Sequence, residues 1–248
     1  MNFKDAYDEP EIYDAESYII CDDINFWKEI IKKHTPRNVL EIGCGTGRIA
    51  RAILQDTAQY TGIDLSQKFL RYFRKTLSKN EQKCVNILEG NACNYKFDEK
   101  YELIILPINF ISHIHDNTEL EQLFGNLRSA LSKNGKIIID YFNPQIRFLD
   151  MSIKNQYCFT FYLDGKEIKA YETHNYNELY QINHIERKYI SNNKTIKTIH
   201  LPMRIYFKNE LEYIIKKSGL LIDEIYGNYS FGAVYDYCDK LIYVLKLT

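Results

Sequence analysis

Three glycines follow a short apolar run in the stretch V-L-E-I-G-C-G-T-G-R-I-A, which covers residues 39–50. Gly43, Gly45 and Gly47 let the backbone bend tightly and approach a ligand closely. A glycine-rich turn that joins a strand to a helix is a frequent nucleotide site, because the first amides of the helix point at the ligand. A dinucleotide-binding turn would have a glycine at position 48, where this chain has Arg48. The pattern therefore indicates a nucleotide-type ligand other than a dinucleotide.

Two carboxylates accompany this turn. Glu41 lies two residues before the first glycine, and Asp64 ends the next strand-like segment, T-G-I-D. A carboxylate at position 41 suits a ligand that carries positive charge better than it suits a pyrophosphate. Asp64 lies about 20 residues beyond the turn, where a carboxylate commonly bonds the ribose hydroxyls of an adenosine cofactor.

The elements that must position these residues alternate between strand-like and helix-like segments through the first two-thirds of the chain. This rhythm predicts an α/β fold, with a mostly parallel sheet and helices on both faces. The predicted strands lie near 38–42, 60–64, 85–89 and 102–107 and in G-K-I-I-I-D-Y-F. Helices are predicted after Asp22-Asp23, at 46–55, at 67–79, from Asn117 or Thr118 to Asn134-Gly135, and at 208–218.

The rhythm changes near residue 151, where strand-like segments follow each other without intervening helices. Asp164-Gly165 is a strong hairpin signal, and a second strand pair surrounds Asn192-Asn193. We therefore expect residues 155–206 to form a four-stranded antiparallel sheet. The predicted division is a cofactor-binding domain at 1–150 and 207–248, with an antiparallel lid insert at 151–206.

The segments V-L-E-I-G-C-G-T-G-R, G-I-D-L-S, L-E-G-N-A-C-N-Y and Y-E-L-I-I-L-P resemble the class I S-adenosylmethionine-dependent methyltransferases. The resemblance covers roughly residues 1–145, and the C-terminal helix and paired strands also fit. It is to the small-molecule subgroup with a β-rich lid insert over the active site. It implies a Rossmann-like sheet, mostly parallel with an antiparallel last strand, and S-adenosyl-L-methionine as cofactor.

The resemblance also implies roles for individual residues. Glu41 would orient the ammonium end of the cofactor, Asp64 would bond the ribose, and Leu65 would pack on the adenine. Most relatives have Asp where Asn91 stands, but an Asn oxygen can also accept from the adenine amino group. The implied cofactor-binding residues are Glu41, Gly43, Cys44, Gly45, Gly47, Asp64, Leu65, Asn91, Ala92, Pro107, Ile108 and Tyr13.

The methyl acceptor is expected outside the carboxyl ends of the strands. The loop I-N-F-I-S-H-I-H-D is similar to loops of the subgroup that carry Asn followed four residues later by His, here Asn109 and His113. If the loop is helical, both side chains lie on one face, and both are predicted to be catalytic. His113 is a candidate general base or substrate anchor, or a histidine that only packs.

Other acceptor contacts are expected from the N-terminal segment, the insert and the last loops. Tyr7 and Tyr13 are predicted to close over the cofactor. Arg204 could bind a substrate carboxylate or phosphate, or pair with an acidic neighbour. The predicted substrate-binding residues are Tyr7, Phe110, Tyr141, Arg204 and Tyr229.

Composition limits the kinds of partner. The 248 residues are 45% hydrophobic and carry a net charge of −1, so no general nucleic-acid binder is indicated. The polar start and the lack of a long apolar stretch indicate neither a signal peptide nor a membrane span, and we expect a cytoplasmic protein. The six cysteines form no C-x-x-C pair, so no metal site is predicted. A homodimer is compatible with the sequence.

The predicted activity is methyl transfer to a small metabolite or short peptide, with nitrogen favoured over oxygen. An amine needs only to be neutral when it attacks, whereas a hydroxyl needs a base. One alternative is a tRNA or protein methyltransferase, whose docking face the insert would supply. Another is a non-catalytic cofactor-binding sensor or scaffold, and a nucleotide-dependent dehydrogenase is the remaining alternative.

Overall fold

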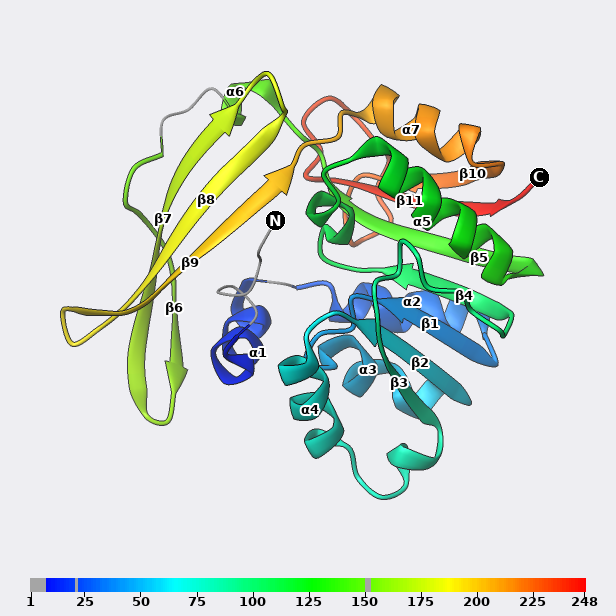
Figure 1. The fold of residues 1–248 in the computed structure, drawn as a ribbon, viewed down its shortest axis with the longest axis horizontal. Helices are drawn as coiled ribbons and strands as arrows, with labels where there is room; N and C mark the ends of the chain where they lie inside the picture. Colours follow the sequence, from blue (N-terminus) through cyan, green and yellow to red (C-terminus); the bar gives the residue numbers. More distant parts are fainter. Residues whose placement is uncertain (1–7, 21, 150–152) are drawn as a thin grey trace.

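The computed structural model describes residues 8–20, 22–149 and 153–248. A seven-stranded sheet with the order β10-β11-β5-β4-β1-β2-β3 forms the centre of the main domain (Figure 1). Its strands are β1 (Asn38–Ile42), β2 (Gln59–Asp64), β3 (Val85–Glu89), β4 (Tyr101–Leu106), β5 (Leu131–Phe142), β10 (Leu220–Tyr226) and β11 (Lys240–Leu247).

Strands β1 to β5 are parallel to one another, and β11 runs antiparallel between β5 and β10. The strand order therefore reverses between β1 and β4. In open α/β sheets, ligands bind at such a reversal, outside the carboxyl ends of the strands. The predicted fold class is confirmed, including the antiparallel last strand.

Helices cover both faces of this sheet, because each face is apolar. One face packs α2 (Ile24–His34), α3 (Arg48–Ile53) and α4 (Gln67–Thr76) through Phe26, Trp27 and Phe73. The other packs α5 (Asn117–Ala130) and α7 (Lys208–Lys217). The shorter helices are η1 (Leu54–Asp56), η2 (Glu81–Lys83), η3 (Phe110–His113) and α6 (Ile146–Leu149).

Helix α5 begins at Asn117, one of the two predicted starts, but it ends earlier than predicted. Its N-cap is Asp116, whose side chain accepts from the amides of Thr118 and Glu119. The helix stops at Ala130, and Asn134-Gly135 lies inside β5.

The insert is a four-stranded antiparallel sheet of consecutive hairpins with the order β6-β7-β8-β9. Its strands are β6 (Gln156–Leu163), β7 (Lys166–Asn177), β8 (Ile182–Ser191) and β9 (Lys194–Arg204). Asp164-Gly165 and Asn192-Asn193 have positive φ values, as tight hairpin turns require.

The helix α1 (Pro10–Ile20) lies between the insert and the main domain (Figure 1). Ile12 on α1 packs with Phe161 and Tyr189 of the insert in a third apolar cluster. The insert faces the carboxyl ends of the parallel strands, where the predicted lid was expected (Figure 1). Among the residues described, no helix is long and apolar enough to cross a membrane.

Candidate active site

A cavity of about 790 Å³ lies at the carboxyl ends of β1, β2 and β4. It is lined by the glycine turn, the start of α4, the segment after β3, the segment after β4, and α1. The predicted residues that line it are Tyr13, Glu41, Gly43, Cys44, Gly45, Asp64, Leu65, Asn91, Ala92, Pro107, Ile108, Phe110 and His113.

The glycine turn has the tight geometry that its sequence predicts. Gly43 has a φ of 71°, and a Cβ at this position would stand 2.4 Å from the ring of Phe110. Gly47 has a φ of 81°, and a Cβ there would stand 2.1 Å from Phe73. Larger residues at these two positions would therefore clash as well as strain the backbone.

Glu41 is a buried carboxyl group at the floor of the cavity. It accepts a hydrogen bond of 2.6 Å from the hydroxyl of Tyr60. Burial raises the pKa of Glu41 to about 8, against the opposing effects of Tyr60 and Arg48. A buried carboxyl group of this kind is stabilised in its charged form by a cationic ligand.

Asp64 connects the glycine turn to the end of β2. One carboxylate oxygen accepts from the amide of Gly45 at 2.9 Å, and the other accepts from the amide of Ser66 at 2.7 Å. Burial raises the pKa of Asp64 despite these bonds. Leu65 lies beside it with 68% of its surface exposed, available for packing under a planar ring.

The segment after β3 forms the far end of the cavity. The side-chain oxygen of Asn91 accepts from the amide of Cys93 at 3.0 Å. A carbonyl oxygen has two lone pairs, so this bond leaves one for a further donor. Glu119 of α5 also lines this end, and nothing in the sequence had singled it out.

The segment after β4 does not form a helix that includes both Asn109 and His113, which was the condition for a shared face. Ile108 and Asn109 both have left-handed backbones, with φ values of 47° and 55°, and η3 begins only at Phe110. The side chain of Asn109 accepts from the amide of Phe142 at 2.8 Å. Asn109 therefore does not share a helical face with His113 and is not among the residues that line the cavity.

His113 lines the cavity in the segment after β4, with its ring centroid 6.5 Å from that of Phe110. Burial, followed by the neighbouring His115, lowers the pKa of His113 to about 4. The imidazole is therefore neutral at physiological pH. His115 points elsewhere and bonds the carbonyl of Pro202 at 2.9 Å.

Three of the predicted substrate-binding residues form an ion pair or hydrogen bonds with other residues of the protein. Arg204 pairs with Glu210 at 2.7 Å, which is the acidic-neighbour interpretation of this residue. The buried hydroxyl of Tyr141 accepts from the amide of Tyr206 at 2.7 Å. The hydroxyl of Tyr229 donates to Asp140 at 2.8 Å. None of the three lines the cavity, and Tyr7 lies outside the described residues.

Sequence patterns had not indicated the contacts that dock α1. Asp14 accepts from the hydroxyl of Thr46 and from Arg51, each at 2.6 Å. Tyr13 lies in the same turn of α1 and packs on Phe69, with a centroid distance of 4.8 Å. This arrangement places Tyr13 over the glycine turn.

A buried charged cluster joins α1 to the inner face of the insert. Glu16 accepts from Arg187 at 3.1 Å and from Tyr189 at 2.6 Å. Arg187 also donates to Glu172 at 2.7 Å. Burial raises the pKa of Glu16, whereas His174 and Arg187 hold the pKa of Glu172 at about 2 despite its burial.

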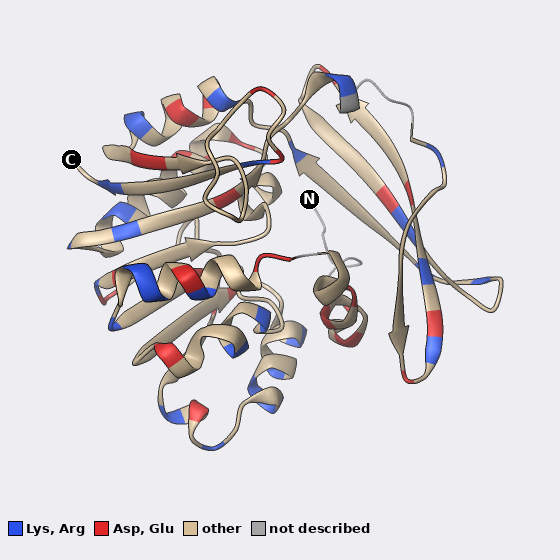
Figure 2. Ribbon diagram, turned by 180° about the vertical axis from the view of Figure 1, so that it is seen from behind, with Lys and Arg blue, Asp and Glu red and all other residues tan. Residues whose placement is uncertain are grey.

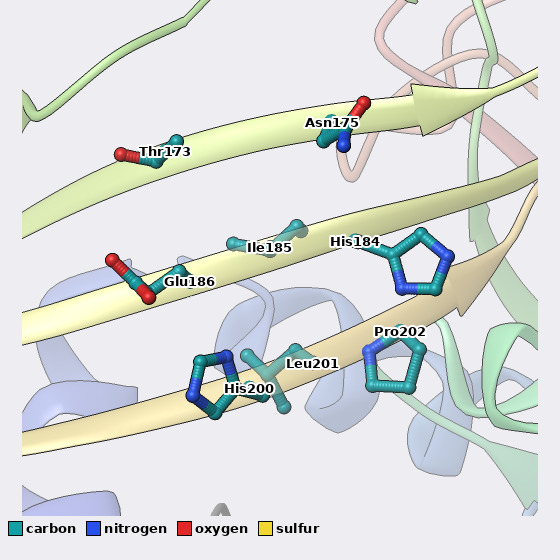
Figure 3. A pocket seen from close by; sticks show the side chains of 8 residues that line it. All are labelled: Thr173, Asn175, His184, Ile185, Glu186, His200, Leu201 and Pro202. Atoms are coloured by element: carbon teal, nitrogen blue, oxygen red, sulfur yellow. The ribbon is translucent and has the colours of Figure 1, made fainter.

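A second, shallower hollow of about 400 Å³ lies on the insert, away from the glycine turn (Figure 3). Its lining includes His184, Glu186 and His200, on β8 and β9. Within the described part of the chain, no group of three or more His, Cys, Asp or Glu side chains is arranged to hold a metal ion.

Residues 39–135 match a family model described as a methyltransferase domain. The fold is similar to that of the CcbJ methyltransferase of Streptomyces caelestis, with a TM-score of 0.78, 18% identity, and coverage of 92% of this chain and 95% of that chain. It is also similar to an S-adenosylmethionine-dependent methyltransferase of Clostridium acetobutylicum, with a TM-score of 0.75, 19% identity, and coverage of 95% and 96%.

Among curated relatives, a tRNA (guanine-N(7)-)-methyltransferase of Prochlorococcus marinus is 26% identical over 68% of this chain and 84% of its own length. The chain spans only 42% and 40% of the length of two other relatives, from Geobacillus sp. and Schizosaccharomyces pombe. Residues 39–135 therefore have the sequence pattern of a methyltransferase domain, and the fold is that of the S-adenosylmethionine-dependent methyltransferases to which it is similar.

The cavity fits the cofactor of this class. Its floor has a turn in which two glycines leave no room for a side chain. A buried carboxyl group, Glu41, is bonded by the hydroxyl of Tyr60, and a second carboxylate, Asp64, stands at the end of β2. These features match the cationic methionyl part and the ribose of S-adenosylmethionine.

Proposed function

We propose that this protein transfers the methyl group of S-adenosylmethionine to a nitrogen atom of a small metabolite or short peptide. When bound, the cofactor supplies a methyl group already activated by its sulfonium. The protein has to bind the cofactor, align the acceptor with the carbon–sulfur bond, and exclude water. Glu41 and Asp64 would bind the ammonium and ribose, and the turn at Gly43 would lie under the methionyl part.

The neutral imidazole of His113 carries the choice of nitrogen over oxygen. Phe110, Ile114 and Ile108 line the same cavity with apolar surface. A base with a pKa of about 4 is poorly matched to removing a proton from a hydroxyl group. A neutral imidazole can still bond an N–H group and direct the nitrogen lone pair. An amine that enters in its neutral form needs no further deprotonation before it attacks.

The charge of the cavity supports a neutral or cationic acceptor. Its lining includes the carboxyl groups of Asp8, Glu41, Asp64 and Glu119. Of the cations that line it, Arg48 pairs with Asp23 at 2.7 Å and Lys68 pairs with Asp8. A phosphate group would meet unfavourable charge at this site.

Relatives of known chemistry support the same choice. Similar folds include the sugar N-methyltransferase KedS8 of Streptoalloteichus, with a TM-score of 0.69, and the glycopeptide N-methyltransferase MtfA, with a TM-score of 0.63. A cypemycin N-terminal methyltransferase of Streptomyces is 25% identical over 58% of this chain. Each of these proteins is named for methylation of nitrogen on a sugar or peptide-like molecule.

The second candidate is methylation of a tRNA base, which the relative in Prochlorococcus marinus favours because its similarity extends over most of its length. RNA binding requires a continuous basic surface. In Figure 2, Lys and Arg are interspersed with Asp and Glu over the main domain and the insert as a whole, although the helix α4 carries Lys and Arg without Asp or Glu. This mixed pattern favours the small acceptor.

The test is a screen with a cofactor that carries a labelled methyl group and with mass spectrometry of the products. The panel comprises amino sugars, amino acids, peptides with free N-termini, phenols and bulk tRNA, with Asp64→Ala as the inactive control. Label on an amine supports the proposal. Label on phenols or tRNA alone would overturn it. Tight cofactor binding without transfer to any class would favour a sensor or scaffold.

A further inference from the structure

The turn that follows β4 has an unusual backbone. Ile108 and Asn109 are consecutive residues in the left-handed region, with φ values of 47° and 55°. Asparagine adopts this conformation readily, but a β-branched residue such as isoleucine is strained in it. Strained backbone persists only where surrounding contacts hold it, and it is frequent at functional sites.

Three hydrogen bonds attach this turn to the end of β5. The amide of Ile108 donates to a carboxylate oxygen of Asp140 at 3.0 Å. The amide of Asn109 donates to the backbone carbonyl of Asp140, also at 3.0 Å. In return, the side chain of Asn109 accepts from the amide of Phe142 at 2.8 Å. Among the residues that the structure describes, Asp140 is thus the one whose side chain bonds the backbone of Ile108.

Asp140 is itself held from the other side. Its side chain is fully buried, and it accepts from Lys240 at 3.0 Å and from the hydroxyl of Tyr229 at 2.8 Å. The ammonium of Lys240 lies 4.8 Å from the ring centroid of Tyr229. These partners compensate the buried negative charge and fix the orientation of the carboxylate toward the turn.

The turn positions the part of the cavity beside His113, where the proposed methyl acceptor would bind; this part is the acceptor end of the cavity. Ile108 lines the cavity, and η3 follows directly with Phe110 and His113. The Phe110 ring packs where a Cβ on Gly43 would stand, so the same segment contacts the cofactor turn. A relaxation of Ile108 to negative φ would therefore displace both rings relative to the methyl donor.

We propose that Asp140 is a positioning residue for methyl transfer: it holds Ile108 in the left-handed conformation and thereby aligns Phe110 and His113 with the reacting atoms. Its importance for the reaction rests on the proposed function, whereas its effect on the turn does not. The two can therefore be measured separately.

The experiment compares Asp140→Ala, Asp140→Asn and Tyr229→Phe. Histidine-ring NMR signals, assigned with His113→Gln, report the turn without any acceptor. In Asp140→Ala we expect the His113 signals to shift and kcat to fall by about ten- to a hundredfold, with little change in affinity for S-adenosylhomocysteine. Asp140→Asn keeps an acceptor for the amide of Ile108 and should retain most of kcat. Tyr229→Phe removes one of the two bonds that orient Asp140 and keeps the bond to the turn, so it should lower kcat less than Asp140→Ala does.

A double variant separates positioning from general stability. Glycine adopts the left-handed region without strain, so Asp140→Ala should cost less in an Ile108→Gly background than in the wild type. Equal losses of kcat in both backgrounds, or unchanged His113 signals in Asp140→Ala, would overturn the proposal. If Asp140→Ala does not fold, Asp140→Asn provides the test. A folded Asp140→Asn protein whose kcat is as low as that of His113→Gln would also overturn the proposal. If no acceptor is methylated by the wild type, the proposed function fails, and the NMR comparison still tests the turn.

Discussion

The two ends of the cavity are built from contacts of different range along the chain. At the cofactor end, the glycine turn, Glu41 and Asp64 belong to adjacent strands, and Asp64 bonds the amide of Gly45 directly. At the acceptor end, the turn at Ile108 depends on Asp140 and, through it, on Lys240. The cover of the cavity, α1, is held to the insert by residues more than 150 positions apart.

This difference separates two kinds of change. The cofactor end relies on backbone geometry that a few glycines and carboxylates specify locally. The acceptor end relies on buried polar contacts between distant segments, so substitutions far from the cavity are expected to alter it. The following predictions test this contrast, from the largest expected effect to the smallest.

Arg187→Ala should be the most damaging change to the contacts that hold α1 to the insert. It would leave Glu16 and Glu172 buried without their common cation, and loss of one partner of a buried ion pair costs about 3–5 kcal/mol. Urea denaturation would measure this loss. Lys188→Ala is the matched control, because its pair with Glu186 is exposed and should contribute about 1 kcal/mol or less. Equal losses in the two variants would contradict the importance of the buried cluster.

Asp64→Ala should be the most damaging change to the cofactor end. Loss of two charge-assisted bonds to the ribose should weaken binding of S-adenosylmethionine and S-adenosylhomocysteine by about 2–3 kcal/mol, or about 30- to 150-fold. Asp64→Asn retains an acceptor for Gly45 and should lose less. Calorimetry that finds the affinity of Asp64→Ala unchanged would refute the placement of the ribose.

Glu41 should make cofactor affinity depend on pH. Its pKa of about 8 keeps the carboxyl group protonated in the empty site at neutral pH, whereas a bound ammonium favours the ionised form. Affinity for S-adenosylhomocysteine should therefore rise with pH by up to about tenfold per unit below pH 8, with release of a proton. Above pH 8 the carboxyl group is already ionised in the empty site, so the rise should end there.

Calorimetry in buffers of different ionisation enthalpy measures the released proton. Glu41→Gln should remove the pH dependence below pH 7. The same shift makes Glu41 favour folding below its ordinary pKa and lose that contribution as pH rises toward 8. Identical affinities at pH 6 and pH 8 in the wild type would contradict the role of Glu41.

His113→Gln should have the smallest of these effects. Loss of one hydrogen bond to the acceptor is expected to lower kcat/KM by about five- to tenfold. Because the pKa of His113 is about 4 rather than 6.5, its titration should be absent from the rate profile between pH 6 and pH 8. An inflection in that range that disappears in His113→Gln would restore the general-base role.

The same histidine should affect stability at acid pH. The unfolded chain binds a proton on this ring near pH 6.5, and the folded protein binds it only near pH 4. The wild type should therefore lose stability as pH falls between these values, and His113→Gln should lose less. Thermal unfolding at several pH values measures the difference.

The contrast between the two ends also explains how much the sequence could predict. The parallel sheet and the Asp164-Gly165 hairpin follow from periodicity and turn residues, which act over a few positions. The lining positions of Glu41 and Asp64 follow from spacing along adjacent strands. The partners of Asp140 lie up to 100 residues away, and no local pattern specifies them.

Local patterns failed where a distant contact prevailed. Asn109 and His113 have helical spacing, but the bond from Phe142 to Asn109 stabilises a left-handed residue instead. The sequence left open whether Arg204 binds an anion or pairs with an acidic neighbour, and Glu210 on the next helix is its partner. A search for carboxylates at the ends of neighbouring strands would have found Asp140, which follows the buried run of β5.

The hydrogen bond between Tyr141 and Tyr206 has an evolutionary consequence. These two buried residues stand where the chain leaves the main sheet after β5 and where it returns before α7, and the bond joins the two points. Because the bond fixes both points, the insert between them is free to change in sequence with little effect on the register of the central strands. Descendants of such a protein can therefore diverge in the molecule they modify while inheriting the same methyl donor.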